Sequence, residues 1–176
     1  MNYLQSLLND DSSILQSDHI HLEEYAKGIL YLKPKQKNTS SKIALSCGIH
    51  GNETAPIEII NEILNKVISG QLKLNAELLI IFGHIKAMKR QERFIDFNLN
   101  RLFNQEWQNH SDAQEAKRAQ QIEHHVSHFF AKSKKVNIHL DLHTAIAKSH
   151  HHKFCICPYS KPVSYTHLTL PTKRIV

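Results

Sequence analysis

The chain has 176 residues, enough for one domain with a sizeable buried core. Its composition, 41% hydrophobic and 22% charged, is globular, and the absence of any eighteen-residue apolar run excludes a membrane-spanning helix. The formal net charge is +6, but the basic residues are scattered and form no basic helix, which argues against a nucleic-acid partner. The three cysteines do not suggest a disulfide framework and the N-terminus does not resemble a secretory signal, so we expect a cytoplasmic location.

Strands and helices alternate along the predicted chain. The first part is expected to form a short amphipathic helix within 1–17, two extended pieces within 19–33, a polar loop at 33–41, and a buried strand that runs into a tight turn within 42–51. A helix capped by Asn52 or Thr54 and ended by Gly70 follows, and then a strand at 77–84. The remaining elements are an ordered loop with short turns at 85–108, a helix at 111–132, and strands at 136–143 and 153–158. This alternation predicts an α/β architecture with helices on the faces of a sheet.

Metal-ligating side chains follow two of the predicted strands. His50 lies in the turn after the first buried strand, Glu53 begins the next helix, and His143 ends a later strand. Sites in α/β sheets gather at the carboxyl ends of strands, and two His with one carboxylate form a catalytic zinc set that leaves one position for water. Asp141 is a candidate outer partner that orients a ligand imidazole.

The alternative is that these residues have no shared role. A His-x-x-Glu spacing is weak evidence in a chain with 14 histidines, because solvated histidine is easily accommodated. The joint placement of His50, Glu53 and His143 after predicted strands favours the metal site.

The string GIHGNETAPIE at 48–58, followed about ninety residues later by DLHTAI at 141–146, resembles the succinylglutamate desuccinylase and aspartoacylase family. The order of elements and motifs agrees from about residue 43 to residue 158. The resemblance implies a zinc carboxypeptidase-like fold, a mixed sheet flanked by helices, of which this chain is the N-terminal part. It also implies one Zn²⁺ per chain, held by His50, Glu53 and His143.

The segment RFIDFNLNRLF at 93–103 resembles the substrate-binding segment of that family. The resemblance assigns Arg93, Asn100 and Arg101 to binding of the substrate carboxylates, a role that suits arginine because its guanidinium binds carboxylate in a bidentate fork. The alternative is that these are surface charges on a loop.

The sequence departs from the family pattern at three places. Asn98 replaces an expected Asp, Ala147 replaces the Arg usual in desuccinylases, and His84 lies where the family has the Asn of a Gly-Asn-Pro string. These departures put the acyl specificity in doubt. The SHHHKF string at 149–154 still resembles the desuccinylase pattern, and we interpret its three histidines as a solvated loop in preference to a second metal site.

The family resemblance also implies a general-base Glu on a strand beyond the DLH motif, and no counterpart follows His143 here. From Val163 the chain reads VSYTHLTLPTKRIV, which resembles the translation of a sequencing adapter and has no counterpart in the family. We therefore expect residues 1–162 to be part of a catalytic domain and 163–176 to be foreign; the alternative is a natural tail.

The resemblance implies zinc-dependent hydrolysis of an N-acyl amino acid, N-succinylglutamate first, in arginine breakdown. The chain as it stands is expected to be inactive for lack of the general base. An aspartoacylase-like deacylase with another acyl group and a non-catalytic zinc-binding module are the alternatives. The oligomeric state is left open.

Overall fold

The computed structural model describes residues 2–11, 15–35, 41–131 and 137–144. Its strands are β1 (Ile20–Ala26), β2 (Ile29–Pro34), β3 (Lys42–Cys47), β4 (Glu77–Phe82) and β5 (Asn137–Asp141). Its helices are α1 (Tyr3–Asn9), α2 (Thr54–Ile68), α3 (Ile85–Arg90) and α4 (Gln114–Phe130), with 3₁₀ turns η1 (Leu99–Arg101) and η2 (Glu106–His110). In the described part of the chain, no helix is both long and apolar enough to cross a bilayer.

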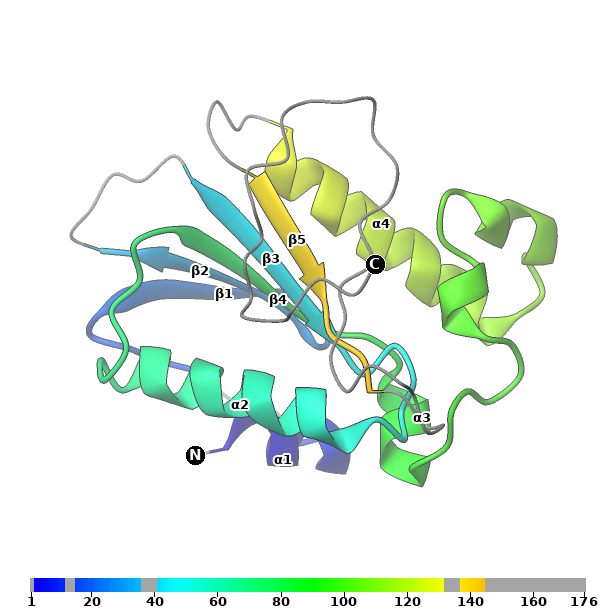
Figure 1. Ribbon diagram of the computed structural model, residues 1–176, viewed down its shortest axis with the longest axis horizontal. Coiled ribbons are helices and arrows are strands. Elements are labelled where there is room, and N and C mark those ends of the chain that lie inside the picture. Colours follow the sequence, from blue (N-terminus) through cyan, green and yellow to red (C-terminus); the bar gives the residue numbers. More distant parts are fainter. Residues whose placement is uncertain (1, 12–14, 36–40, 132–136, 145–176) are drawn as a thin grey trace, which may run out of the picture. The chain divides into compact units, whose positions relative to one another are not determined.

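The five strands form one mixed sheet in the order β1-β2-β4-β3-β5. β3 runs parallel to both β4 and β5, whereas β2 is antiparallel to β1 and β4. Helices α1 and α2 cover one face and α4 covers the other (Figure 1). The expected mixed sheet flanked by helices is therefore confirmed, and the carboxyl ends of β3, β4 and β5 lie at one edge.

The central strand β4 shows why this architecture forms. Every residue of β4 after Glu77 is buried, because both faces of the strand are covered. Leu78, Ile80 and Phe82 pack towards α1 and α2, while Leu79 and Ile81 pack towards α4. Alternate side chains of one strand thus hold the two helical layers together.

Helix α2 has the predicted apolar face and ends just before Gly70, but its N-terminus differs from the prediction. Its buried side chains are Pro56, Ile57, Ile60, Leu64 and Val67. The expected caps, Asn52 and Thr54, are wrong, because Glu53 occupies the N-cap position and makes no capping hydrogen bond. The Glu53 carboxylate points instead towards two histidines. The N-terminus of α2 therefore lacks the side-chain capping hydrogen bond that would stabilise it.

Three further predictions need comment. The loop expected at 85–108 contains the short helix α3 and both 3₁₀ turns. Helix α3 escaped prediction because it has only six residues and buries only Ala87 and Met88, too few to show a helical period. The first helix is shorter than expected and ends at Asn9. The strand predicted at 153–158 lies outside the described residues.

Candidate metal centre

The turn after β3 is shaped by two glycines. Gly48 has a φ of 65°, a left-handed conformation that glycine adopts without strain. A Cβ on Gly51 would lie 2.0 Å from the Ala87 backbone carbon, so α3 packs directly on the turn. This close approach fixes the chain between β3 and α2, where His50 and Glu53 are only 3% exposed.

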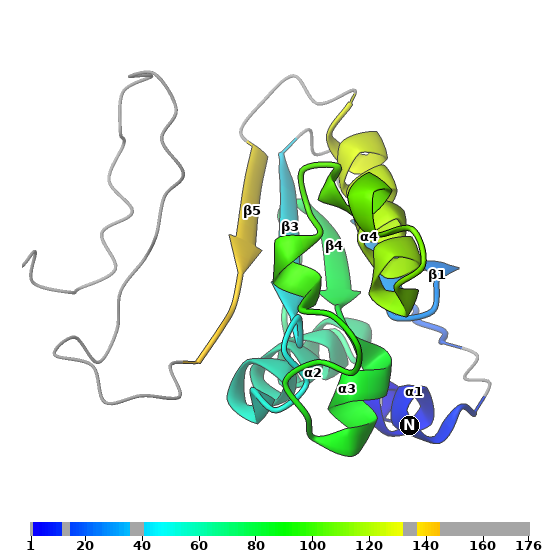
Figure 2. The same ribbon diagram turned by 90° about the vertical axis from the view of Figure 1, so that its right-hand side faces the viewer.

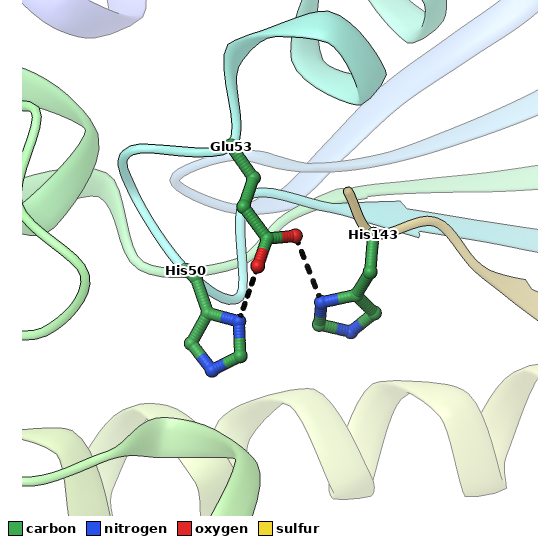
Figure 3. Close-up of side chains that lie close together, drawn as sticks. All are labelled: His50, Glu53 and His143. Atoms are coloured by element: carbon green, nitrogen blue, oxygen red, sulfur yellow. Dashed lines mark hydrogen bonds and ion pairs between the residues drawn. The ribbon is translucent and has the colours of Figure 1, made fainter. Parts of the chain in front are cut away.

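Glu53 lies at the middle of the site, between two imidazole rings (Figure 3). Its Oε1 is 2.8 Å from His50 Nδ1, and its Oε2 is 3.0 Å from His143 Nδ1. The Thr144 backbone N–H donates to Oε2 at 2.8 Å, and the Arg93 guanidinium reaches Oε1 at 3.5 Å. The carboxylate is therefore surrounded by four nitrogen atoms from three segments of the chain.

The other ring nitrogens of the two histidines face oxygen acceptors. His50 Nε2 lies 3.2 Å from Asn98 Oδ1, and His143 Nε2 lies 2.7 Å from Asp141 Oδ2. The hydrogen bond with Asp141 raises the pKa of His143, although partial burial opposes the shift. Every ring nitrogen of the two histidines therefore has an oxygen atom within hydrogen-bond distance, and both Nδ1 atoms are directed towards Glu53.

Asp141 is itself held by its neighbour in the sheet. Ser46 lies opposite Asp141 in the β3–β5 register, and its hydroxyl donates to Asp141 Oδ1 at 2.7 Å. The His139 ring reaches the same hydroxyl at 3.0 Å. A chain of hydrogen bonds therefore runs from the strand pair to His143. The role of Asp141 as an outer partner of a metal ligand stays a prediction.

The donor set fits a divalent metal ion. The ligand atoms of His50, Glu53 and His143 all lie within 4.8 Å of one another, and this is the one such group of three among the described residues. Two imidazole nitrogens and a carboxylate oxygen are ligands that suit zinc. The second nitrogen of each imidazole contacts an oxygen atom, of Asn98 or Asp141, as is usual for histidines that bind a metal.

The predicted substrate residues lie on the segment that borders this centre. Arg93 contacts Glu53, so it lies near a candidate metal ligand. Asn100 and Arg101 are exposed on η1, and Asn100 N–H donates to the Asn98 oxygen that faces His50. Their role in substrate binding stays a prediction. Ala147, Ser149 and His151 lie outside the described residues.

Sequence reasoning missed Glu115, and it noted His84 only as a departure from the family pattern. Glu115 of α4 is buried, and its Oε1 accepts from Asp96 N–H at 2.9 Å and from Ile95 N–H at 3.3 Å. His84 Nε2 donates to the same oxygen at 2.9 Å, since the Ala87 N–H points at its Nδ1. Glu115 thereby fixes the backbone that leads from Arg93 to η1. No sequence signal marked Glu115, because its burial and its backbone partners depend on how α4 packs.

Residues 39–171 match the succinylglutamate desuccinylase/aspartoacylase catalytic domain, and the chain belongs to this family. The match includes the first nine residues of the segment at 163–176.

Individual relatives agree with the family assignment. The chain is 43% identical over 134 residues to the succinylglutamate desuccinylase of Yersinia enterocolitica, covering 76% of this chain and 40% of that protein. It is 40% identical over 156 residues to the Shewanella piezotolerans succinylglutamate desuccinylase, covering 85% and 44%. The chain thus spans less than half the length of these curated relatives.

Solved structures share the fold. The succinylglutamate desuccinylase of Chromobacterium violaceum superposes with a TM-score of 0.78 at 34% identity, covering 85% of this chain and 48% of that one. The Vibrio parahaemolyticus enzyme gives a TM-score of 0.75 at 34% identity, covering 85% and 52%. The zinc carboxypeptidase-like fold expected from the sequence is confirmed.

Proposed function

We propose that the intact protein is a zinc-dependent amidohydrolase that cleaves N-succinylglutamate to succinate and glutamate. The observation that supports this most directly is the Glu53 carboxylate between the Nδ1 atoms of His50 and His143. The relatives that are named succinylglutamate desuccinylase support the substrate. Arginine breakdown and a cytoplasmic location belong to the same proposal.

His50, Glu53 and His143 would hold one Zn²⁺ per chain. A zinc ion in such a site polarises the substrate carbonyl and lowers the pKa of bound water. The protein's own contribution is orientation: Asn98 and Asp141 keep the proton of each ring on Nε2, which leaves each Nδ1 lone pair for the metal. Thr144 N–H holds Glu53 Oε2 in place.

Arg93, Asn100 and Arg101 would bind the carboxylates of the substrate. Arg93 is already directed to the ligand Glu53, and its guanidinium is partly exposed, so it can also reach a substrate carboxylate beside the metal. Asn100 and Arg101 are exposed next to Asn98 on the same segment.

Proton transfer to the leaving amine requires a general base. We propose that a Glu supplies it from a region of the longer relatives that this chain does not span, and that residues 163–176 are not native. On this proposal the 176-residue chain binds zinc but does not turn over substrate.

Two measurements test the function. Metal analysis of the purified chain after zinc loading and dialysis should give one zinc per chain, and none for the Glu53→Ala variant. The gene, recovered together with its continuation past Pro162, should release succinate from N-succinylglutamate. Release of acetate from an N-acetyl amino acid instead would favour the aspartoacylase-like alternative. Zinc binding without any deacylation would favour the non-catalytic module.

A further inference from the structure

A cavity of about 630 Å³ lies beside α3. None of its lining residues is a proposed metal ligand or a predicted substrate residue. Its volume is within the range of small-molecule sites. Basic side chains predominate in its lining, which consists of Asp10, Lys27, His84, Ile85, Lys86, Lys89, Arg90, Ile95, Gln114, Glu115 and Arg118. Five of these residues are basic and two are acidic, so the cavity carries an excess of positive charge.

Helix α3 contributes two cations, Lys86 and Arg90, that have no anionic partner among the described residues. Lys86 and Arg90 are four residues apart, so they lie on the same side of the helix, where like charges repel each other. Lys86 donates only to the neutral Gln114 side chain. Arg90 makes no hydrogen bond or ion pair within the described part of the chain. Repulsion between these charges is relieved when an anion binds between them.

The rim of the cavity already holds one carboxylate. Lys27, from the turn between β1 and β2, and Lys89 of α3 both form ion pairs with Asp10. The hydrogen bonds from Lys27 and Lys89 lower the pKa of Asp10 to about 2. The carboxylate of Asp10, a residue of the same chain, thus shows that the basic rim binds a carboxylate group.

Arg118 adds a positive charge at the cavity wall, and no carboxylate in the described part of the chain forms an ion pair with it. Its guanidinium donates to Gly83 O at 2.8 Å, to Phe82 O at 2.6 Å and to the Gln121 side chain at 2.6 Å, which are all neutral acceptors. Burial lowers the pKa of Arg118 to about 10, against the opposing field of Tyr3 and Glu24. A partly desolvated cation of this kind is stabilised by an anion nearby.

We propose that this cavity binds a small multivalent anion, a polycarboxylate or a phosphate-type oxyanion, through Lys86, Lys89 and Arg90, with the Arg118 charge behind them. The site also adjoins the predicted substrate segment. Ile95 lines the cavity, and Glu115 in the same lining holds the Ile95 and Asp96 N–H groups. An anion bound in the cavity would therefore lie beside the residues that hold the backbone of the segment beginning at Arg93.

The test uses the metal-free chain, prepared on a chelating resin, so that it does not depend on the proposed function. Sulfate and propane-1,2,3-tricarboxylate are titrated in separate experiments while backbone amide NMR signals are recorded at constant ionic strength. We expect saturable shifts at residues 84–90 and 114–118. Binding of sulfate alone would identify an oxyanion site, and binding of the tricarboxylate alone would identify a carboxylate site.

The test variant is the pair Lys86→Gln and Arg90→Gln, which keeps helix-forming side chains of similar length on exposed positions. We expect the double variant to bind the anion at least tenfold more weakly. The matched control is Lys73→Gln with Lys117→Gln, which removes the same charge from exposed positions outside the cavity lining.

Three results would overturn the proposal. They are equal weakening in the test and control variants, shifts that centre on His50, Glu53 and His143, and the absence of saturation with both anions. If the glutamine pair does not give a native amide spectrum, the single variant Arg90→Gln serves instead, because Arg90 has no partner to lose in the described chain.

Discussion

The two halves of the candidate metal centre are built in different ways. His50 and Glu53 are three residues apart in a turn whose strand, β3, is paired on both sides, and both are 3% exposed. His143 comes ninety residues after Glu53, just past β5, and its side chain is 30% exposed. In the described part of the sheet, β5 pairs only with β3 (Figure 2). One half is thus fixed by local geometry, while the other depends on strand register and hydrogen bonds.

Glu53 joins the two halves, so its loss should have the largest effect. The Glu53→Ala variant should lower zinc affinity by more than the roughly 10–100-fold that removal of an outer partner costs. Competition with a fluorescent zinc chelator measures the affinity. Glu58→Ala is the control, because Glu58 is an exposed carboxylate on the same helix. Equal affinity for the two variants would contradict the central role of Glu53.

The buried turn can be tested through its glycine. Gly51→Ala places a Cβ against the Ala87 backbone, which cannot move as a flexible side chain can, and should cost at least about 3 kcal/mol of unfolding free energy. Urea unfolding measures the change. In the control, Gly70→Ala, the new Cβ meets the His19 side chain and φ is 77°, so a loss of only about 1–2 kcal/mol is expected. A smaller loss for Gly51 would show that α3 does not hold the turn.

The exposed half should depend more on its hydrogen-bond partner. Asp141→Ala removes the acceptor of His143 Nε2 and should lower zinc affinity by about 10–100-fold. Asn98→Ala removes the longer contact to His50, a ring already confined by burial, so its effect should be smaller. The same chelator competition compares them. A larger loss of zinc affinity for Asn98→Ala than for Asp141→Ala would mean that burial of the His50 ring does not make up for a lost hydrogen bond.

Glu115 holds the backbone of the segment between Arg93 and η1. We expect its replacement to have the smallest effect of these changes. Burial raises its pKa, but hydrogen bonds from the Asp96 N–H and His84 outweigh this and lower it to about 2. Its stabilisation should therefore be complete above the unfolded value of about 4.3 and lost as the pH falls towards 2.

Replacing Glu115 by Gln keeps an acceptor but removes the charge, and should cost about 1.5 kcal/mol at pH 7. Urea midpoints of the wild type and Glu115→Gln, measured without metal from pH 7 to pH 2.5, give the comparison. The difference should shrink below about pH 4. A difference that stays constant across this range would show that the Glu115 charge has no such role.

The sequence by itself determined those features that depend on one short stretch of the chain. The turn HGNE places His50 and Glu53 three residues apart whatever surrounds them, and the apolar patterns of β4 and α2 predict buried elements. His143 was found from its place at the end of a predicted strand, and the family strings supported it and added the segment at 93–103. Each of these signals lies within one short stretch of chain or a motif, so sequence reasoning can find it.

Only the tertiary structure decided which residues support the site. Ser46 meets Asp141 because of the β3–β5 register, Asn98 meets His50 from a loop 48 positions away, and Glu115 reaches the segment before η1 from α4. The helix α3 forms because Ala87 and Met88 pack on the turn, although its own sequence has little helical period. Contacts between distant segments depend on which strands pair and on how the layers pack, and the pattern of one segment alone does not name its partners.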